Sequence, residues 1–132
     1  MKNQLTALIV EDNASVRDLI VFALRRIDGL TTVEASHGVD ALERLEDISP
    51  DIIITDINMP VMDGLSLLKH VRSREHLADI PILVITTEQA AADKARAIAL
   101  GATSYITKPI RAPRLLQEVN HLLERDRTRA AQ

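Results

Sequence analysis

Short runs of apolar residues alternate along the chain with longer stretches in which apolar residues recur every three or four positions. The short runs are rich in Val, Ile and Thr, and turn-forming residues flank them, which favours buried strands over helices. We expect five strands, over residues 5–10, 31–35, 52–55, 82–86 and 104–107.

The longer stretches have the spacing of amphipathic helices, with one apolar face each. Asn13 is a suitable N-cap for the first of them, and Gly29 follows its end. The predicted apolar face of this helix consists of Val16, Leu19, Ile20, Ala23 and Ile27.

Four more helices are expected after the other strands. They are a short helix around residues 41–45, one that starts near 63–64, an alanine-rich one over 90–100 and a last one over 112–125. We expect one domain over residues 1–125 and a short C-terminal tail over 126–132.

Five strand–helix units in this order predict an α/β fold, a parallel sheet with helices on both faces. Right-handed crossovers lead us to expect a (βα)5, flavodoxin-like, doubly wound sheet with strand order 2-1-3-4-5. In such sheets ligands bind beyond the carboxyl ends of the strands, near the point where the strand order reverses. That point lies between the first and third strands.

Composition narrows the class of protein further. With 132 residues, a net charge of −3 and no cysteine, the chain has no basic field for nucleic acid and no disulfides. No apolar run approaches the roughly 20 residues that span a bilayer. We therefore expect a cytoplasmic protein with no membrane insertion and no direct contact to nucleic acid.

Polar residues stand where the predicted strands end. Glu11 and Asp12 follow the first strand, Asp56 follows the third, Thr86 ends the fourth and Lys108 follows the fifth. The carboxyl ends of parallel strands meet at one edge, so these residues are predicted to lie together. Three carboxylates at one site repel each other unless a cation or a proton intervenes, and oxygen ligands of this kind suit Mg²⁺.

Each of these residues also has a structural explanation when it is considered alone. The acidic pair is suited to cap a helix, and Asp56 is suited to a turn before Pro60. Thr86 fits an ordinary strand, and Lys108 with Pro109 fits an ordinary turn. Only their shared position at one sheet edge favours a functional site.

The chain resembles the receiver domains of two-component response regulators over nearly all of its length. The motifs that carry the resemblance are Ile9-Val10-Glu11-Asp12, the run from Asp56 to Gly64 (DINMPVMDG), Ile85-Thr86-Thr87, and Gly101-Ala102 leading into Tyr105-Ile106-Thr107-Lys108-Pro109. Their order and spacing are more specific than any one motif.

The resemblance implies a role for each site residue. Asp56 is the implied phosphoacceptor, and Asp12, Asp56 and the backbone carbonyl of Asn58 are the implied Mg²⁺ ligands. Glu11 is implied to contribute through a bound water. Lys108 is implied to pair with the phosphoryl oxygens, and the Lys108–Pro109 peptide bond is expected to be cis.

The resemblance also implies how the signal is passed on. Thr86 is expected to hydrogen-bond the phosphoryl group and, together with Tyr105, to switch the face formed by the fourth helix, fifth strand and fifth helix. Asn58 and Glu88 stand at positions that tune dephosphorylation, and this pair resembles chemotaxis-type receivers. The implied partners are a sensor histidine kinase or a histidine phosphotransfer protein, and a downstream protein target.

Three other functions stay open at this point. They are a phosphorylation-independent docking module, the receiver part of a larger DNA-binding response regulator, and a phosphatase with an aspartyl nucleophile. Asn58 disfavours the phosphatase, because those enzymes place a second Asp at that position as general acid. We expect no enzyme activity beyond the chain's own phosphorylation and dephosphorylation.

Overall fold

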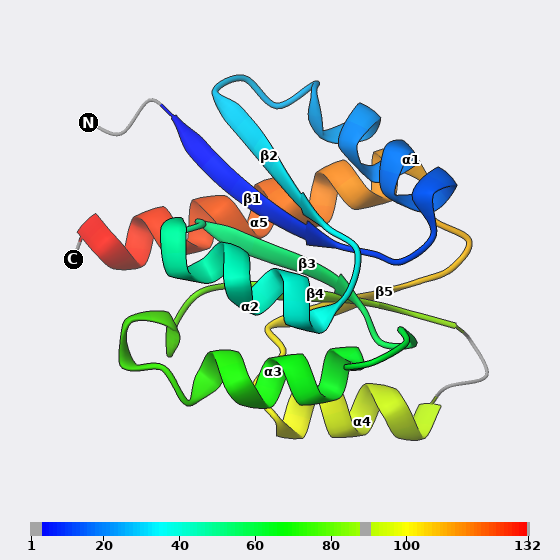
Figure 1. Ribbon diagram of the computed structural model, residues 1–132. Coiled ribbons are helices and arrows are strands. Elements are labelled where there is room, and N and C mark those ends of the chain that lie inside the picture. Colours follow the sequence, from blue (N-terminus) through cyan, green and yellow to red (C-terminus); the bar gives the residue numbers. More distant parts are fainter. Residues whose placement is uncertain (1–3, 88–90, 132) are drawn as a thin grey trace.

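The computed structural model describes residues 4–87 and 91–131, and the described chain forms a central sheet with helices on both sides (Figure 1). The strands are β1 (Leu5–Val10), β2 (Leu30–Ala35), β3 (Ile52–Asp56), β4 (Ile82–Thr86) and β5 (Ser104–Thr107). The helices are α1 (Ala14–Leu24), α2 (Gly38–Asp47), α3 (Gly64–Arg72), the short 3₁₀ helix η1 (Glu75–Leu77), α4 (Ala91–Ala99) and α5 (Ala112–Ala131).

All neighbouring strands are parallel, and their order is β2-β1-β3-β4-β5, as the sequence predicted. The fold is therefore the flavodoxin-like doubly wound sheet. Three strands match the predicted bounds, while β2 begins one residue earlier and β3 ends one residue later. The later end of β3 makes Asp56 its last residue.

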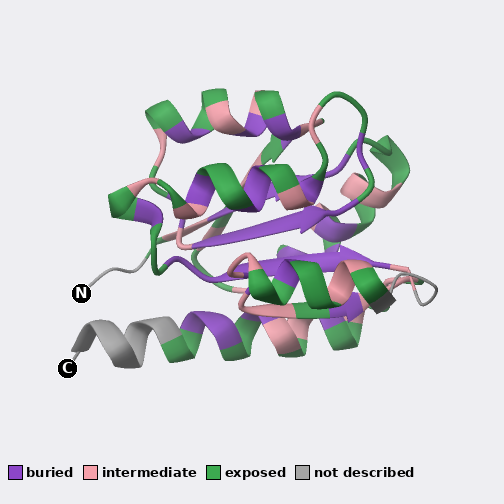
Figure 2. Ribbon diagram, turned by 90° about the horizontal axis from the view of Figure 1, so that it is seen from below, coloured by how far each residue is buried: buried purple, intermediate pink, exposed green. Residues whose placement is uncertain are grey.

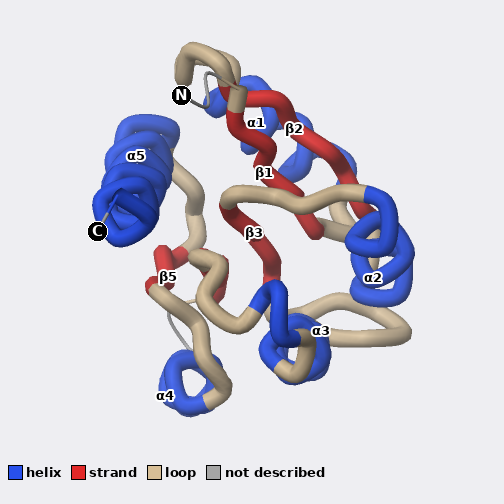
Figure 3. Tube along the Cα trace, turned by 90° about the vertical axis from the view of Figure 1, so that its left-hand side faces the viewer, coloured by secondary structure: helices blue, strands red, loops and turns tan. Residues whose placement is uncertain are grey.

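The two faces of the sheet are covered by different helices (Figure 3). Alternate strand residues point to opposite faces, so Ile9 and Ile54 pack with α1 and α5, whereas Leu8 and Ile53 pack with α2, α3 and α4. The central strands β3 and β4 are buried along their whole length and β1 over its last four residues, whereas the edge strands β2 and β5 are only partly buried. The helices are buried on their inner sides (Figure 2). Each fully buried Leu or Ile contributes about 1.5–3 kcal/mol of hydrophobic stabilisation, which fixes the sheet as a rigid base.

Side chains fix the starts of three helices. Asn13 caps α1 by accepting a hydrogen bond from the amide of Val16, and Asp63 caps α3 in the same way from Ser66. His37 Nδ1 accepts from the amide of Asp40 at the start of α2. The caps of α1 and α3 hold both helix starts directly beside the carboxyl edge of the sheet.

The predicted apolar face of α1 was partly wrong. Ile20 and Ala23 are buried as expected, but Leu19 is 43% exposed, and Leu24 is buried in its place. The inward stripe is rotated toward Leu24, because α1 packs against both α5 and the sheet. The spacing of apolar residues in the sequence does not predict this rotation of α1.

The last helix is longer than predicted. It continues through 126–131, which the sequence interpretation placed in a tail. Those residues contain neither Gly nor Pro, so no helix breaker stops α5 after residue 125. Within the described residues, no helix is both long and apolar enough to cross a membrane.

Candidate functional site

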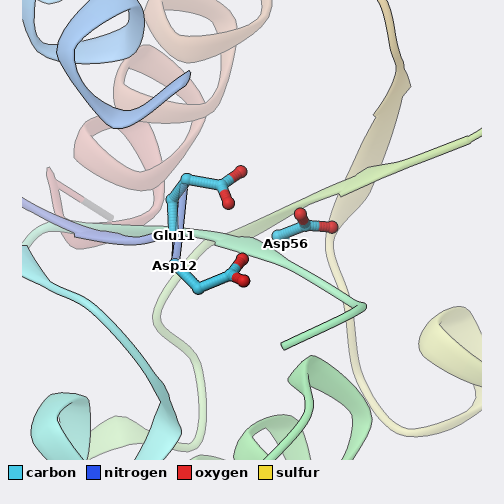
Figure 4. Close-up of side chains that lie close together, drawn as sticks. All are labelled: Glu11, Asp12 and Asp56. Carbon is cyan, nitrogen blue, oxygen red and sulfur yellow. The ribbon is translucent and has the colours of Figure 1, made fainter. Parts of the chain in front are cut away.

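Three carboxylates gather where β1 and β3 end (Figure 4). These strands are neighbours in register, with Val10 paired to Thr55, so the residues that follow come to one point. Glu11, Asp12 and Asp56 each place a carboxylate oxygen within 4.8 Å of the others. The predicted convergence of these three residues is thus present in the structure.

The three carboxylates differ in their surroundings. Glu11 and Asp56 are 1% and 4% exposed, whereas Asp12 is exposed. Glu11 Oε2 accepts a hydrogen bond from the amide of Asn13 at 3.0 Å, but the buried Oε1 has no hydrogen-bond partner. Burial, with the neighbouring charge of Asp56, raises the pKa of Glu11 to about 7.

Lys108 is the cation of this cluster. Its Nζ donates to Asp56 Oδ2 at 2.7 Å and lies 3.6 Å from Glu11 Oε1. Burial opposes the charged form of Lys108, yet the hydrogen bond to Asp56 and the negative charges of Asp56 and Glu11 together raise its pKa. Lys108 is therefore held charged against the two buried carboxylates.

The backbone places Lys108 beside β4. Its amide donates to the carbonyl of Thr86 at 2.7 Å, which joins the ends of β4 and β5. The Lys108–Pro109 peptide bond is cis, the conformation that the resemblance implied.

The loop after β3 closes tightly around Asp56. The amide of Asn58 donates to Asp56 Oδ1 at 3.3 Å, and the amide of Gly64 donates to the carbonyl of Ile57 at 2.8 Å. A Cβ atom on Gly64 would overlap the carbonyl oxygen of Asp56, so only glycine permits this approach of α3 to the end of β3. Val61, in the same loop, has φ 70°, a left-handed conformation that is unfavourable for a β-branched residue.

The two predicted switch residues lie in different environments. Thr86 is buried at the end of β4, and its hydroxyl donates only a long bond of 3.4 Å to the carbonyl of Thr87. Tyr105 is 40% exposed, and Lys94 Nζ lies 5.0 Å from the centre of its ring. Tyr105 thus points outward, beside α4, and Glu88 lies outside the described residues.

The residues of the cluster fit a divalent cation. Three carboxylates against one lysine leave two negative charges in excess when all are ionised. Glu11 Oε1 is also a buried oxygen without a hydrogen bond, an unfavourable state unless another group approaches it. Oxygen donors of this kind are those that Mg²⁺ prefers.

Arg17 contacts the site, and the sequence interpretation assigned it no role there. Arg17 Nη1 donates to the carbonyl of Glu11 at 2.7 Å, and its Nε lies 3.1 Å from Glu34 Oε1. The sequence shows only that Arg17 lies in the first turn of the helix that follows the acidic pair. This position does not reveal that its partner, Glu34, lies on β2.

Comparison with known proteins agrees with the fold and the site. Residues 7–120 match the response regulator receiver domain family, and the chain belongs to this family. Receiver domains of this family are signalling modules, and this chain is a receiver of the CheY type with an acidic pocket.

Three relatives illustrate the similarity. The chain is 41% identical over 112 residues to the chemotaxis protein CheY1 of Helicobacter pylori, covering 84% of this chain and 90% of that protein. It is 43% identical over 112 residues to the Regulator of RpoS of Escherichia coli K12, covering 85% of this chain and 32% of that longer protein. The structure of the chemotaxis response regulator CheY4 of Vibrio cholerae has a TM-score of 0.84 at 33% identity, covering 90% of this chain and 98% of that chain.

Proposed function

We propose that the chain is a phosphorylation switch that accepts a phosphoryl group on Asp56 in the presence of Mg²⁺. The observation that carries the proposal is the buried Asp56 carboxylate, held by Lys108 at 2.7 Å and faced by two further carboxylates. A lysine and a divalent cation together supply the positive charge that phosphoryl transfer requires. The phosphatase and the phosphorylation-independent docking function each lack such a supporting observation.

The transfer step follows from these residues. A carboxylate oxygen of Asp56 attacks the phosphorus of a phosphohistidine, the P–O bond forms, and the P–N bond to the imidazole breaks. The imidazole leaves with the electron pair of that bond and takes a proton from solvent. Asp12, Asp56 and the backbone carbonyl of Asn58 would hold Mg²⁺, with Glu11 acting through a water, and the bound ion would supply positive charge against the phosphoryl oxygens.

Lys108 stabilises the product. Its ammonium already contacts Asp56 and is proposed to stay paired with the phosphoryl oxygens after transfer. The new group adds a charge of about −1.5 to −2, together with acceptor oxygens, so hydroxyl donors nearby are attracted to it. The hydroxyl of Thr86 is free to turn toward it, because its present bond is long.

The switch is proposed to act on the face formed by α4, β5 and α5. Lys108 and Thr86 are joined through the backbone, so a shift of either is transmitted to the start of the β5–α5 connection. Tyr105, on β5, is proposed to exchange its exposed position for an inward one. Asn58 and Glu88 are proposed to set how fast the phosphoryl group is lost.

The partners follow from this chemistry. We propose a sensor histidine kinase or a histidine phosphotransfer protein as donor and a downstream protein as target, with chemotaxis as the process that the CheY-type relatives suggest. No direct contact with nucleic acid and no membrane insertion are proposed, and the cytoplasm is the proposed location.

The test is the intact mass of the protein after incubation with acetyl phosphate and Mg²⁺. We expect one added phosphoryl mass in the wild type and none in Asp56→Asn or in a sample with EDTA. The Asn variant is a matched control because it keeps the shape of the side chain and the amide of Asn58 as a neighbour. An adduct that persists in Asp56→Asn places the acceptor elsewhere, and no adduct with any donor favours a docking module.

A further inference from the structure

Arg17 links three elements at the acidic pair. It belongs to α1, it donates to the carbonyl of Glu11 just beyond β1 at 2.7 Å, and it is paired at 3.1 Å with Glu34 on β2. Its side chain is 20% exposed, whereas that of Glu34 is 46% exposed. The Arg17 side chain is thus mostly buried, and its guanidinium joins the residue after β1 to a residue on β2.

These contacts restrain the peptide that joins the two acidic residues. The carbonyl of Glu11 and the amide of Asp12 belong to one planar unit, so holding the first fixes the direction in which Asp12 leaves the strand. The amide of Glu11 is also held, since it donates to the carbonyl of Ala35 at 3.1 Å. β2 therefore holds Glu11 twice, once through its own backbone and once through Glu34 and Arg17.

We propose that Arg17, oriented by Glu34, is a positioning residue for the divalent cation at Glu11, Asp12 and Asp56. This inference rests on the function proposed above. Without a cation, the three carboxylates repel each other, and the exposed Asp12 is the member that can swing away. The hydrogen bond to the Glu11 carbonyl keeps the backbone of Asp12 in place, so less conformational freedom is lost when the cation binds.

The geometry distinguishes this role from a general charge effect. A planar guanidinium donates in two directions at once, here to a carbonyl and to a carboxylate. A lysine at this position keeps the charge but has only one ammonium group, so it cannot keep both partners in the same geometry. Arg25, at the exposed end of the same helix, offers a matched control because its loss changes the charge of α1 equally.

The experiment measures Mg²⁺ affinity by calorimetric titration in five variants: Arg17→Ala, Arg17→Lys, Glu34→Gln, the double variant Arg17→Ala/Glu34→Gln and the control Arg25→Ala. Loss of a residue that orients metal ligands typically weakens affinity by about ten-fold or more, and we expect this for Arg17→Ala. Arg17→Lys and Glu34→Gln are expected to lie between Arg17→Ala and the wild type. Glu34→Gln should add nothing further in the Arg17→Ala background, because both act through one contact chain.

Two other readouts separate positioning from a loss of structure. The rate of labelling by acetyl phosphate at saturating Mg²⁺ should stay within about two-fold of wild type, because the reacting groups themselves are intact. The urea midpoint in EDTA should change similarly in Arg17→Ala and Arg17→Lys, although their Mg²⁺ affinities differ.

The proposal is overturned if Arg17→Ala binds Mg²⁺ as the wild type does, or if Arg25→Ala weakens binding equally. It is also overturned if the maximal labelling rate falls while the affinity stays unchanged. A wild-type protein that does not bind Mg²⁺ at all is a different result, because the function proposed above then fails together with this inference.

Discussion

Each of the two ends of the strands in the sheet has a partly buried basic side chain, and the two side chains have different partners. At the carboxyl edge, Lys108 faces the carboxylates of Asp56 and Glu11. At the opposite edge, Arg72 extends from the end of α3 to the carbonyls of Gly101, Leu77 and Ala78, with distances of 2.7–3.1 Å.

The titration behaviour of the two side chains reflects this difference. Burial lowers the pKa of Arg72, although Asp79 opposes the effect. The pKa of Lys108 is raised in spite of burial, because its neighbours are carboxylates. Arg72 thus joins α3 to two other backbone segments through neutral carbonyl acceptors, while Lys108 belongs to a cluster with excess negative charge.

The backbone conformation also differs between the two edges: it is unstrained at the amino edge and strained at the carboxyl edge. The amino edge uses Gly101 for its positive φ of 108°, a conformation that glycine adopts without strain. The carboxyl edge places Val61 at φ 70°, where a β-branched residue is strained. Hydrogen-bonded groups and an unstrained backbone indicate a structural role, whereas a buried carboxylate oxygen without a hydrogen bond, excess negative charge and backbone strain indicate a site built for a ligand.

The largest effect is expected at the amino edge, from Arg72→Met. The change leaves three carbonyls on two segments without their donor, so the free energy of unfolding should fall by about 3 kcal/mol. Urea unfolding measures this loss, and calorimetry should give an Mg²⁺ affinity close to wild type. An Arg72→Met protein that is as stable as wild type but does not bind Mg²⁺ would contradict the claim that Arg72 has a structural role and the carboxyl edge binds the cation.

An effect of opposite sign is expected at the carboxyl edge, from Glu11→Gln in EDTA. The folded protein keeps a proton on Glu11 up to pH about 7, against an ordinary value of 4.5. The contribution of Glu11 to wild-type stability is therefore complete below the lower pKa and is lost as the pH rises through the higher one, by on the order of 3 kcal/mol at most. Gln has no charge to desolvate, so the variant should be the more stable protein at about pH 8.

Unfolding curves of both proteins across this pH range check the sign. The two proteins should be similar in acid and should diverge as the pH rises. Parallel pH profiles, or a variant that is less stable under alkaline conditions, would mean that burial does not raise the pKa of Glu11.

The smallest effect is expected from Val61→Gly. Relief of the left-handed conformation stabilises the loop, while the added freedom of glycine in the unfolded chain opposes the gain, so we expect a net gain of about 0.5 kcal/mol. Val61→Ala serves as the control, since it shortens the side chain but keeps a Cβ atom. Equal midpoints for the Gly and Ala variants would show that Val61 is not strained.

The fold could be predicted from the sequence because strand runs and turn residues are local signals. The run 52–55 and the polar residue after it predicted both β3 and the position of Asp56 at its end. The strand order followed from the connections, since five βα units with right-handed crossovers leave few alternatives. The convergence of Glu11, Asp12 and Asp56 was then a consequence of the topology.

What the sequence did not predict depends on contacts between distant elements. Leu19 is exposed because the packing of α1 on α5 sets the rotation of the helix. The roles of Arg17 and Arg72 were not predicted, since their acceptors lie on other segments. The strain at Val61 depends on how closely Gly64 brings α3 to β3, which no spacing in the sequence expresses.

The most direct test of this account is the effect of Mg²⁺ on stability, measured by urea unfolding at about pH 8 in MgCl₂ and in NaCl of equal ionic strength. A cation that binds only the folded cluster should raise the free energy of unfolding by about 1 kcal/mol or more at about 10 mM Mg²⁺, and the gain should shrink in Asp56→Asn. Identical midpoints of the wild type in the two salts would contradict the claim that the excess charge at the carboxyl edge exists to hold a cation.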